Sequence, residues 1–183
     1  WLDRTARPPA DEAYLELVRT FVNTLDIEKG TDALESSETW GRWCAERGLS
    51  VESSATDRQL LGELREALRE GLLAHHSRGS MPLAAREVLD RMLAWSQAEA
   101  TFTEEGLRLL PRGDGAHYVA GRILSLVAQA TVDGTWSRLK ACRGDECKWA
   151  FYDHSRSRTG QWCSMAICGN RNKQARLRER RGQ

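Results

Sequence analysis

Four of the five cysteines in this 183-residue chain lie in its last quarter, as two pairs with the same internal spacing. Cys142 and Cys147 form the first pair, Cys163 and Cys168 form the second, and fifteen residues separate the pairs. Thiolates are preferred zinc ligands, and two pairs brought together by the connecting segment supply the four ligands of a tetrahedral site. The spacing therefore predicts a zinc site made by all four. Because four protein ligands leave no open coordination position, the one zinc ion would be structural.

Disulfide bonds and unliganded thiols are the alternatives to zinc for these four cysteines. Disulfides are typical of small secreted domains, whereas this chain is long enough to bury its own core and shows no secretory segment. We therefore favour the metal site. His154 is a weaker candidate ligand, because the four cysteines already complete the set. Cys44, which is far from the others in sequence, is expected to be a packed free thiol.

Charge is distributed unevenly along the chain, although the formal net charge is only +1. Residues 135–183 contain twelve Lys or Arg and four Asp or Glu, which leaves fifteen basic and 22 acidic residues in 1–134. A basic segment joined to an acidic body is typical of a nucleic-acid-binding module attached to another domain. The alternative is a solvated, charged helix without a partner. The position of the charge beside the predicted zinc site favours nucleic acid.

The basic residues after the last cysteine are predicted to lie on a helix. Lys173, Arg176 and Arg180 are spaced by three and four residues, so they share one face that suits a row of phosphates. Arg171 and Arg178 lie seven apart, roughly on the opposite face, and would brace the helix. Two arginines of the loop between the cysteine pairs complete the set of candidate nucleic-acid-binding residues: Arg156, Arg158, Arg171, Lys173, Arg176, Arg178, Arg180 and Arg181.

Aromatic residues close to the cysteines are expected to form the core of this small module. The alternation of Trp149 and Phe151 predicts a strand, with Tyr152 on its opposite face, and we expect a return strand that ends at Trp162. Tyr152 is interpreted as a core residue, with stacking on a nucleic-acid base as the alternative. Two strands followed by the basic helix give a ββα-like finger, whose small core depends on the metal.

The residues before the finger are predicted to be mainly helical, because apolar residues recur there at intervals of three and four. Thr56 or Asp57 would cap the start of the third helix, and Gly48 would end the second. A change of period around Gly106 predicts one β-hairpin. The expected helices cover residues 11–25, 36–47, 56–76, 80–93 and 118–131, and the hairpin covers 100–103 and 107–111.

The predicted fold class is mainly α with a small β-hairpin. A helical N-terminal domain over residues 1–134 is followed by a small zinc-stabilised ββα-like finger over 135–183. The short polar segment 132–141 is interpreted as the linker between the two. No apolar run is long enough to span a membrane, so we expect a cytoplasmic chain without membrane contact.

Polar residues of the helical domain give weaker indications of function. Asn23 and Thr24 fall inside the first predicted helix, where they would either satisfy neighbouring helix ends or touch a ligand. His75 and His76 point to different sides of a helix, so we do not expect a metal site there. No glycine-rich phosphate loop or nucleophile elbow is present, and we expect no enzyme unless His75, His117 and a carboxylate meet in a pocket.

Two parts of the sequence resemble known families. Residues 168–171 read Cys-Gly-Asn-Arg, the motif that names the CGNR zinc finger. Residues 147–156 and 162–165 are similar to the rest of its pattern, so this resemblance covers about 136–180. Residues 21–26 read Phe-Val-Asn-Thr-Leu-Asp and resemble the N-terminal helix motif of ABATE, an all-helical domain that usually precedes this finger. The resemblance implies a stress-induced transcriptional regulator, whose helical domain senses a ligand or dimerises.

Together, the residues and the resemblance lead us to expect a DNA-binding transcriptional regulator with one structural zinc ion. Its partners would be DNA, a second copy in a homodimer, and a small-molecule effector whose binding residues the sequence does not identify. The alternative is a non-DNA interaction module in which zinc is purely structural. In that case the basic helix would bind an acidic protein, the acidic body of the same chain or RNA.

Overall fold

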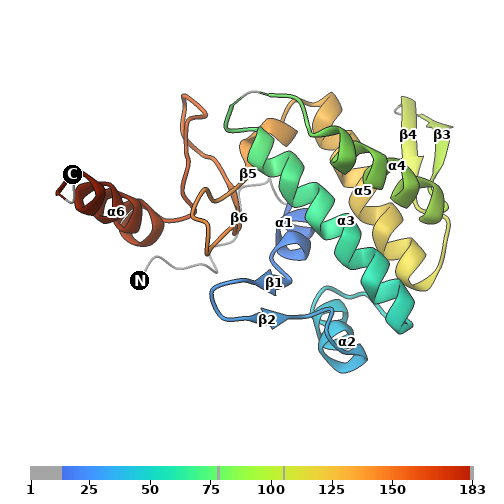
Figure 1. Ribbon diagram of the computed structural model, residues 1–183. Coiled ribbons are helices and arrows are strands. Elements are labelled where there is room, and N and C mark those ends of the chain that lie inside the picture. Colours follow the sequence, from blue (N-terminus) through green and yellow to red (C-terminus); the bar gives the residue numbers. More distant parts are fainter. Residues whose placement is uncertain (1–13, 78, 105, 182–183) are drawn as a thin grey trace.

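The structure is a computed structural model that describes residues 14–77, 79–104 and 106–181 (Figure 1). It is mainly helical, as predicted, with small two-stranded antiparallel sheets. The helices are α1 (Glu16–Val22), α2 (Ser37–Ala45), α3 (Ala55–Ala74), α4 (Leu83–Trp95), α5 (Gly115–Val132) and α6 (Asn170–Arg181). The strands are β1 (Leu25–Asp26), β2 (Thr31–Asp32), β3 (Glu99–Thr103), β4 (Gly106–Leu110), β5 (Leu139–Ala141) and β6 (Ala150–Tyr152).

Helix α3 runs through the centre of the helical body, which we define as α1 to α5, and contacts α1, α4 and α5 (Figure 1). Its apolar side carries Leu61, Leu64, Leu68 and Leu72, all of which are fully buried. Complete burial of one such side chain stabilises a fold by about 2 kcal/mol, so this stripe contributes strongly to the core. Although α3 has 20 residues, neither it nor another described helix is both long and apolar enough to cross a membrane.

Side-chain caps set the starts of α2 and α3. Ser36 accepts a hydrogen bond from the backbone N–H of Thr39, and Ser54 accepts one from the backbone N–H of Asp57. In each case the second side chain bonds back to the backbone of the cap and completes a capping box. The prediction that Thr56 or Asp57 caps α3 was wrong, because Ser54 is the cap and Asp57 is the third residue of the helix.

A tryptophan pair joins α2 to α1. The rings of Trp40 and Trp43 stack with centroids 4.9 Å apart, and Phe21 of α1 meets both rings edge-on. Both tryptophans lie in the core, as predicted, and the chain turns after α2 at Gly48, whose φ is +67°. Cys44 is buried beside them, and burial raises the pKa of its thiol to about 11, so it is a packed free thiol as expected.

Helix α1 is shorter than its predicted counterpart. Residues 11–13 of the predicted helix lie outside the described residues, and the helix ends at Val22. Asn23 is its C-terminal cap and Thr24 leads into β1, so the prediction that both lie within the helix was wrong. The chain leaves the helix here because Thr24 Oγ1 bonds to Phe21 O and because Asn23 bonds to a distant strand, β6.

The hairpin β3–β4 was predicted with its ends shifted by one residue. Phe102 pairs with Leu107 and Thr103 pairs with Gly106, whose φ of +108° suits only glycine. The hairpin packs on α5 through β4, on the side of the molecule opposite to α6 (Figure 1).

The hairpin β5–β6 joins the finger to the helical body. Strand β5 pairs with β6 so that Leu139 lies opposite Tyr152. The prediction that 132–141 is only a linker was therefore wrong, and the partner of β6 is β5 rather than a return strand ending at Trp162. Leu139 and Ala150 are fully buried in the same core as the helices. The strand predicted around Trp149 and Phe151 is confirmed as β6, whereas β5, three residues with a lysine at the centre, has too little periodicity to be recognised from sequence.

Candidate metal centre and nucleic-acid interface

Four cysteine sulfurs meet where the hairpin β5–β6 approaches α6. The Sγ atoms of Cys142, Cys147, Cys163 and Cys168 all lie within 4.8 Å of one another. Cys163 Sγ is 3.6 Å from Cys147 Sγ and 3.8 Å from Cys168 Sγ. Four sulfurs at about 2.3 Å from a tetrahedral zinc ion lie about 3.8 Å apart, so the cluster fits one structural zinc. A disulfide needs about 2.05 Å between its sulfurs, and the four cysteines are free thiols.

A tight turn shapes the first cysteine pair. Gly144 O accepts hydrogen bonds from the backbone N–H groups of Cys147 and Lys148. A Cβ added at Gly144 would lie 3.4 Å from Cys147 Cβ and 3.7 Å from Cys142 Sγ, so the turn is closely packed around the sulfurs. Lys148 then adopts a φ of +49°, in the left-handed region that a residue with a Cβ rarely occupies. The backbone directly after Cys147 therefore needs support from its surroundings.

The electrostatics of the cluster favour a bound cation. Hydrogen bonds from Cys147 and Cys163 lower the pKa of Cys142 to about 2, so one thiolate is stable. Hydrogen bonds with Cys142 and Cys147, burial and repulsion raise the pKa of Cys163 far above its ordinary value. Burial and repulsion raise the pKa of Cys168 to about 12. Four thiolates at neutral pH thus require a compensating positive charge, which a zinc ion supplies.

A buried ion pair organises the arginine loop, which we define as residues 155–160. Lys140 Nζ lies 2.8 Å from Asp153 Oδ2, and only 2% and 3% of the two side chains are exposed. Asp153 also accepts hydrogen bonds from the backbone N–H groups of the first and last loop residues, and Lys140 donates to Arg158 O. Burial opposes ionisation of Asp153, but its donors lower the pKa to about 2. The ion pair thereby fixes the loop backbone from inside.

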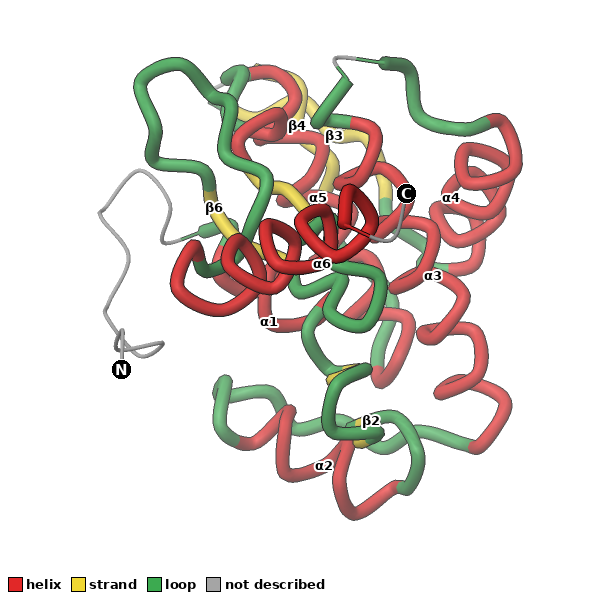
Figure 2. Tube along the Cα trace, turned by 60° about the vertical axis from the view of Figure 1, so that its left-hand side comes forward, coloured by secondary structure: helices red, strands yellow, loops and turns green. Residues whose placement is uncertain are grey.

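Helix α6 and the arginine loop carry the predicted nucleic-acid-binding residues. The helix follows directly after the π-helical turn Met165–Gly169, which contains Cys168, so the metal centre fixes its origin. Figure 1 shows α6 beyond the hairpin β5–β6, away from the helical body, and Figure 2 shows that the connection from β6 to α6 is largely loop. The side chain of Arg181 is outside the described part. Seven of the predicted residues are exposed: Arg156, Arg158, Arg171, Lys173, Arg176, Arg178 and Arg180.

Arg171, at the start of α6, is exposed but forms an ion pair with the helical body. Its Nη2 atom is 2.6 Å from Glu28 Oε1, in the turn between β1 and β2. The hydrogen bond to Glu28 raises the pKa of Arg171 above its ordinary value. A bracing contact of this kind is what its position opposite Lys173, Arg176 and Arg180 predicts.

The helical body also holds the hairpin β5–β6 through Asn23 and Arg69. Asn23 Nδ2 donates to Ala150 O at 2.9 Å, and Asn23 Oδ1 accepts from the N–H of Ala150 at 2.7 Å. Arg69 Nη1 donates to Lys148 O at 2.7 Å. The sequence interpretation of Asn23 as a partner for helix ends or a ligand missed this strand, and it missed Arg69 entirely. The available signal was that Arg65 and Arg69, four residues apart, interrupt the apolar stripe of α3.

The histidines of the helical body make structural hydrogen bonds to backbone oxygens. His75 Nδ1 is 2.7 Å from Leu139 O and His76 Nε2 is 2.6 Å from Ala141 O, so both rings donate to β5. Burial lowers the pKa of both histidines, which favours the neutral rings. His117 bonds to a backbone oxygen at the end of α4 instead. The structure therefore does not bring His75 and His117 together, and the metal-binding group of the described residues is the cysteine cluster.

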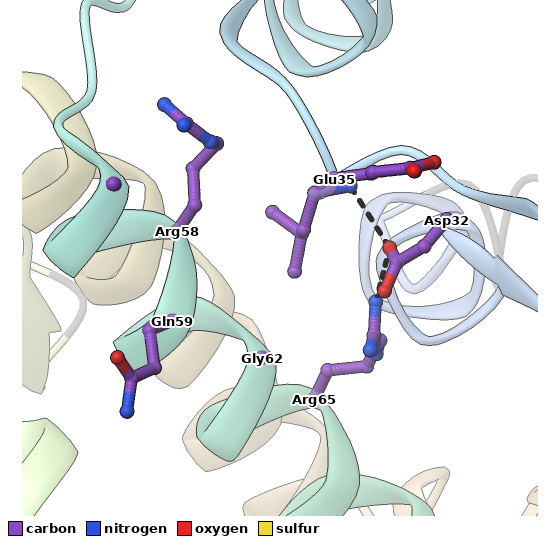
Figure 3. Close-up of a pocket in the computed structure, with 8 residues that line it drawn as sticks. Asp32, Glu35, Arg58, Gln59, Gly62 and Arg65 are labelled. Atoms are coloured by element: carbon purple, nitrogen blue, oxygen red, sulfur yellow. Dashed lines mark hydrogen bonds and ion pairs between the residues drawn. The ribbon is translucent and has the colours of Figure 1, made fainter.

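A shallow cavity of about 300 Å³ lies between α3 and the segment after β2 (Figure 3). The ion pair between Arg65 Nη1 and Asp32 Oδ1, 2.7 Å long, lies at one side of it. In Figure 3 the tips of Arg58 and Gln59 point away from each other, whereas small-molecule sites have polar groups that converge on the ligand. Arg58 and Gln59 therefore do not converge on one ligand position in this cavity. Its lining residues are Asp32, Leu34, Glu35, Ala55, Arg58, Gln59, Gly62 and Arg65.

Comparison with known families agrees with both parts of this architecture. Residues 138–181 match the CGNR zinc finger. Residues 11–134 match ABATE, described as "Putative stress-induced transcription regulator", which is a regulator rather than an enzyme family. Among curated proteins, none matches the sequence. Because the second match spans more than half of the chain, the protein belongs to the ABATE family and carries a CGNR zinc finger after its ABATE domain.

Proposed function

We propose that this protein is a transcription regulator that binds duplex DNA through its zinc finger. The observation that carries the proposal is α6, an exposed helix with six basic residues and one acidic residue that begins at the metal centre and lies away from the helical body (Figure 1). A merely solvated helix would not need a metal centre to fix its origin. In this proposal the zinc ion holds the basic helix in one position for its partner.

The size and charge pattern of α6 suit a DNA groove. Its twelve residues give a length of about 18 Å, and the major groove of about 12 Å width admits an α-helix. Lys173, Arg176 and Arg180 would contact phosphates along one face, and Arg156 and Arg158 of the arginine loop would extend the basic surface. Phosphate contacts of this kind give affinity that is independent of sequence and sensitive to salt.

The proposal divides the work between two parts of the chain. Residues 135–183 bind DNA, with Cys142, Cys147, Cys163 and Cys168 as the ligands of a structural zinc ion. Residues 1–134 form the acidic part, which carries regulation. The change in the sign of the charge supports the division at this point.

The decisive experiment is duplex DNA binding by the full chain, measured by fluorescence anisotropy at several salt concentrations. Zinc-loaded and chelator-treated protein are compared side by side. We expect binding that weakens steeply with salt and disappears with the metal. An absence of binding at low salt by protein with verified zinc content would contradict the proposal.

The alternative is that the basic finger binds acidic protein surface, including the body of its own chain. The ion pair between Arg171 and Glu28 favours this alternative. A Glu28→Gln variant separates the two, with Glu35→Gln, at another exposed glutamate of the body, as the matched control. If the body competes with DNA for the finger, Glu28→Gln binds DNA more tightly than wild type. If Arg171 only braces α6, the variant binds equally well or more weakly.

A further inference from the structure

We propose that Arg69 and Asn23 of the helical body are positioning residues for the zinc centre, and that the body thereby sets the zinc affinity of the finger. Arg69 hydrogen-bonds to the backbone of the first residue after Cys147, one of the four metal ligands, and Asn23 hydrogen-bonds to the backbone of the third. The effect on zinc affinity does not depend on the proposed function. Only a resulting effect on DNA binding rests on it. Zinc binding tests the inference independently.

Arg69 supports the strained residue beside the metal ligand. Its side chain is only 4% exposed, and Nη1 donates to Lys148 O at 2.7 Å. Lys148 occupies the left-handed region with φ +49°, and this conformation is unfavourable for a residue with a Cβ. A charged hydrogen bond to the carbonyl of Lys148 favours the folded conformation of this segment. It therefore favours the position of Cys147 in the cluster.

Asn23 secures the next part of the same segment. Its amide bonds to both backbone groups of Ala150, at 2.9 and 2.7 Å, on the first residue of β6. Arg69 Nη2 meanwhile donates to Val22 O at 2.8 Å, directly before Asn23. The end of α1, the C-terminal half of α3 and the segment after Cys147 are thus joined by adjacent hydrogen bonds.

A chain of ion pairs holds the Arg69 guanidinium in place. Glu66 accepts from Arg69 Nε at 2.9 Å and from Arg65 Nε at 2.7 Å. Arg65 Nη1 pairs in turn with Asp32 at 2.7 Å. Arg65 and Arg69 are both nearly fully buried, and a buried guanidinium is costly unless it is paired and hydrogen-bonded. The ion-pair chain meets that requirement and fixes the direction in which Arg69 presents its N–H groups to the finger.

Metal-affinity measurements on the full chain test the inference. In Arg69→Met the carbonyl of Lys148 loses its donor, while the apolar part of the Arg69 side chain is kept. We expect the zinc affinity to fall about 10- to 100-fold, as for loss of outer-shell partners of a metal site. The affinity is measured by competition with a chromogenic chelator. Asn23→Ala should also lower the zinc affinity, and it should speed the hydrogen exchange of the Ala150 amide. Arg91→Met is the matched control, because Arg91 makes an exposed ion pair with Glu63 on the body.

A second control separates positioning from general loss of stability. Met92→Ala removes a buried side chain of α4, away from the finger, and should lower the free energy of unfolding while leaving zinc affinity near that of wild type. Unchanged zinc affinity in Arg69→Met would overturn the inference. If Arg69→Met does not fold, unchanged zinc affinity and amide exchange in Asn23→Ala would overturn it. If the variants lose zinc affinity but wild-type protein binds no DNA, the positioning role stands and the proposed function fails.

Discussion

At the scale of single residues, the buried pair of Lys140 and Asp153 connects the strand β5 to the arginine loop. Removal of one partner leaves the other charge buried and unpaired, which costs about 3–5 kcal/mol. We therefore expect Lys140→Met to lower the free energy of unfolding by about 3 kcal/mol, measured by guanidinium denaturation of zinc-saturated protein. In the control Lys29→Met, which removes a partner of Asp26 from an exposed position, the change should stay below about 0.5 kcal/mol. Equal effects of the two variants would contradict this role of the pair.

His75 gives the fold a dependence on pH. Burial lowers its pKa in the folded chain below the unfolded value of 6.5, so the unfolded state binds more protons. The associated stability is fully present above pH 6.5 and is lost as the pH falls through the folded pKa. Between pH 7.5 and 5.5 we therefore expect wild type to lose more of its unfolding free energy than His75→Gln does. The measurement is urea denaturation at saturating zinc, with His154→Gln as an exposed control. Parallel curves of unfolding free energy against pH for wild type and His75→Gln would exclude the effect.

Individual residues differ in how far the sequence reveals their roles. The cysteine cluster could be predicted, because ligand type and spacing alone restrict the chemistry to a metal site. Arg69 could not be predicted, because its role depends on a carbonyl 79 residues away. An arginine on a helix is ordinarily a solvated residue, and only its place in the apolar stripe of α3 distinguishes it.

At the scale of elements, α6 is the part of the molecule whose charge can be tested as a unit. Replacing Lys173, Arg176 and Arg180 by Gln should weaken binding to all duplexes and reduce the slope of log K against log salt by about 3, if each contacts one phosphate. A matched triple replacement of exposed body arginines, Arg42, Arg86 and Arg91, keeps the same change in net charge. If both triple variants lose affinity equally, net charge rather than α6 accounts for binding.

The helices and the hairpin β3–β4 could be predicted from sequence, but the hairpin β5–β6 could not. Helices of the body repeat an apolar stripe over several turns, and β3–β4 has strands of five residues around a glycine turn. Strand β5 has three residues, and one of them is Lys140, which appears polar in sequence but is buried by its ion pair with Asp153. The structure of this segment therefore depends on its pairing with β6 and on the buried ion pair, rather than on the local sequence pattern.

At the scale of the whole molecule, the finger and the helical body share one core. Leu139, Ala141 and Ala150 of the hairpin pack with the body residues, and the side chains of His75 and His76 bond to β5. Cys142 follows β5 directly, and two residues lie between Cys147 and the start of β6. The metal ligands are therefore continuous with strands that the body buries. Loss of the metal should therefore lower the stability of the body as well as that of the finger, because zinc binds only the folded chain.

Chelation should accordingly destabilise the entire chain rather than the finger alone. A free zinc concentration about 100 times the Kd stabilises the folded state by about 2.7 kcal/mol. For a chain of this length that corresponds to an increase of about 5–10 °C in Tm. We expect calorimetry of zinc-saturated protein to show one main transition that moves down by this amount when the metal is chelated. Cys163→Ser, which lacks one ligand, should melt at the lower temperature with or without chelator. A main transition that chelation leaves unmoved would mean that the body folds independently of the zinc centre, and that the shared core does not couple them.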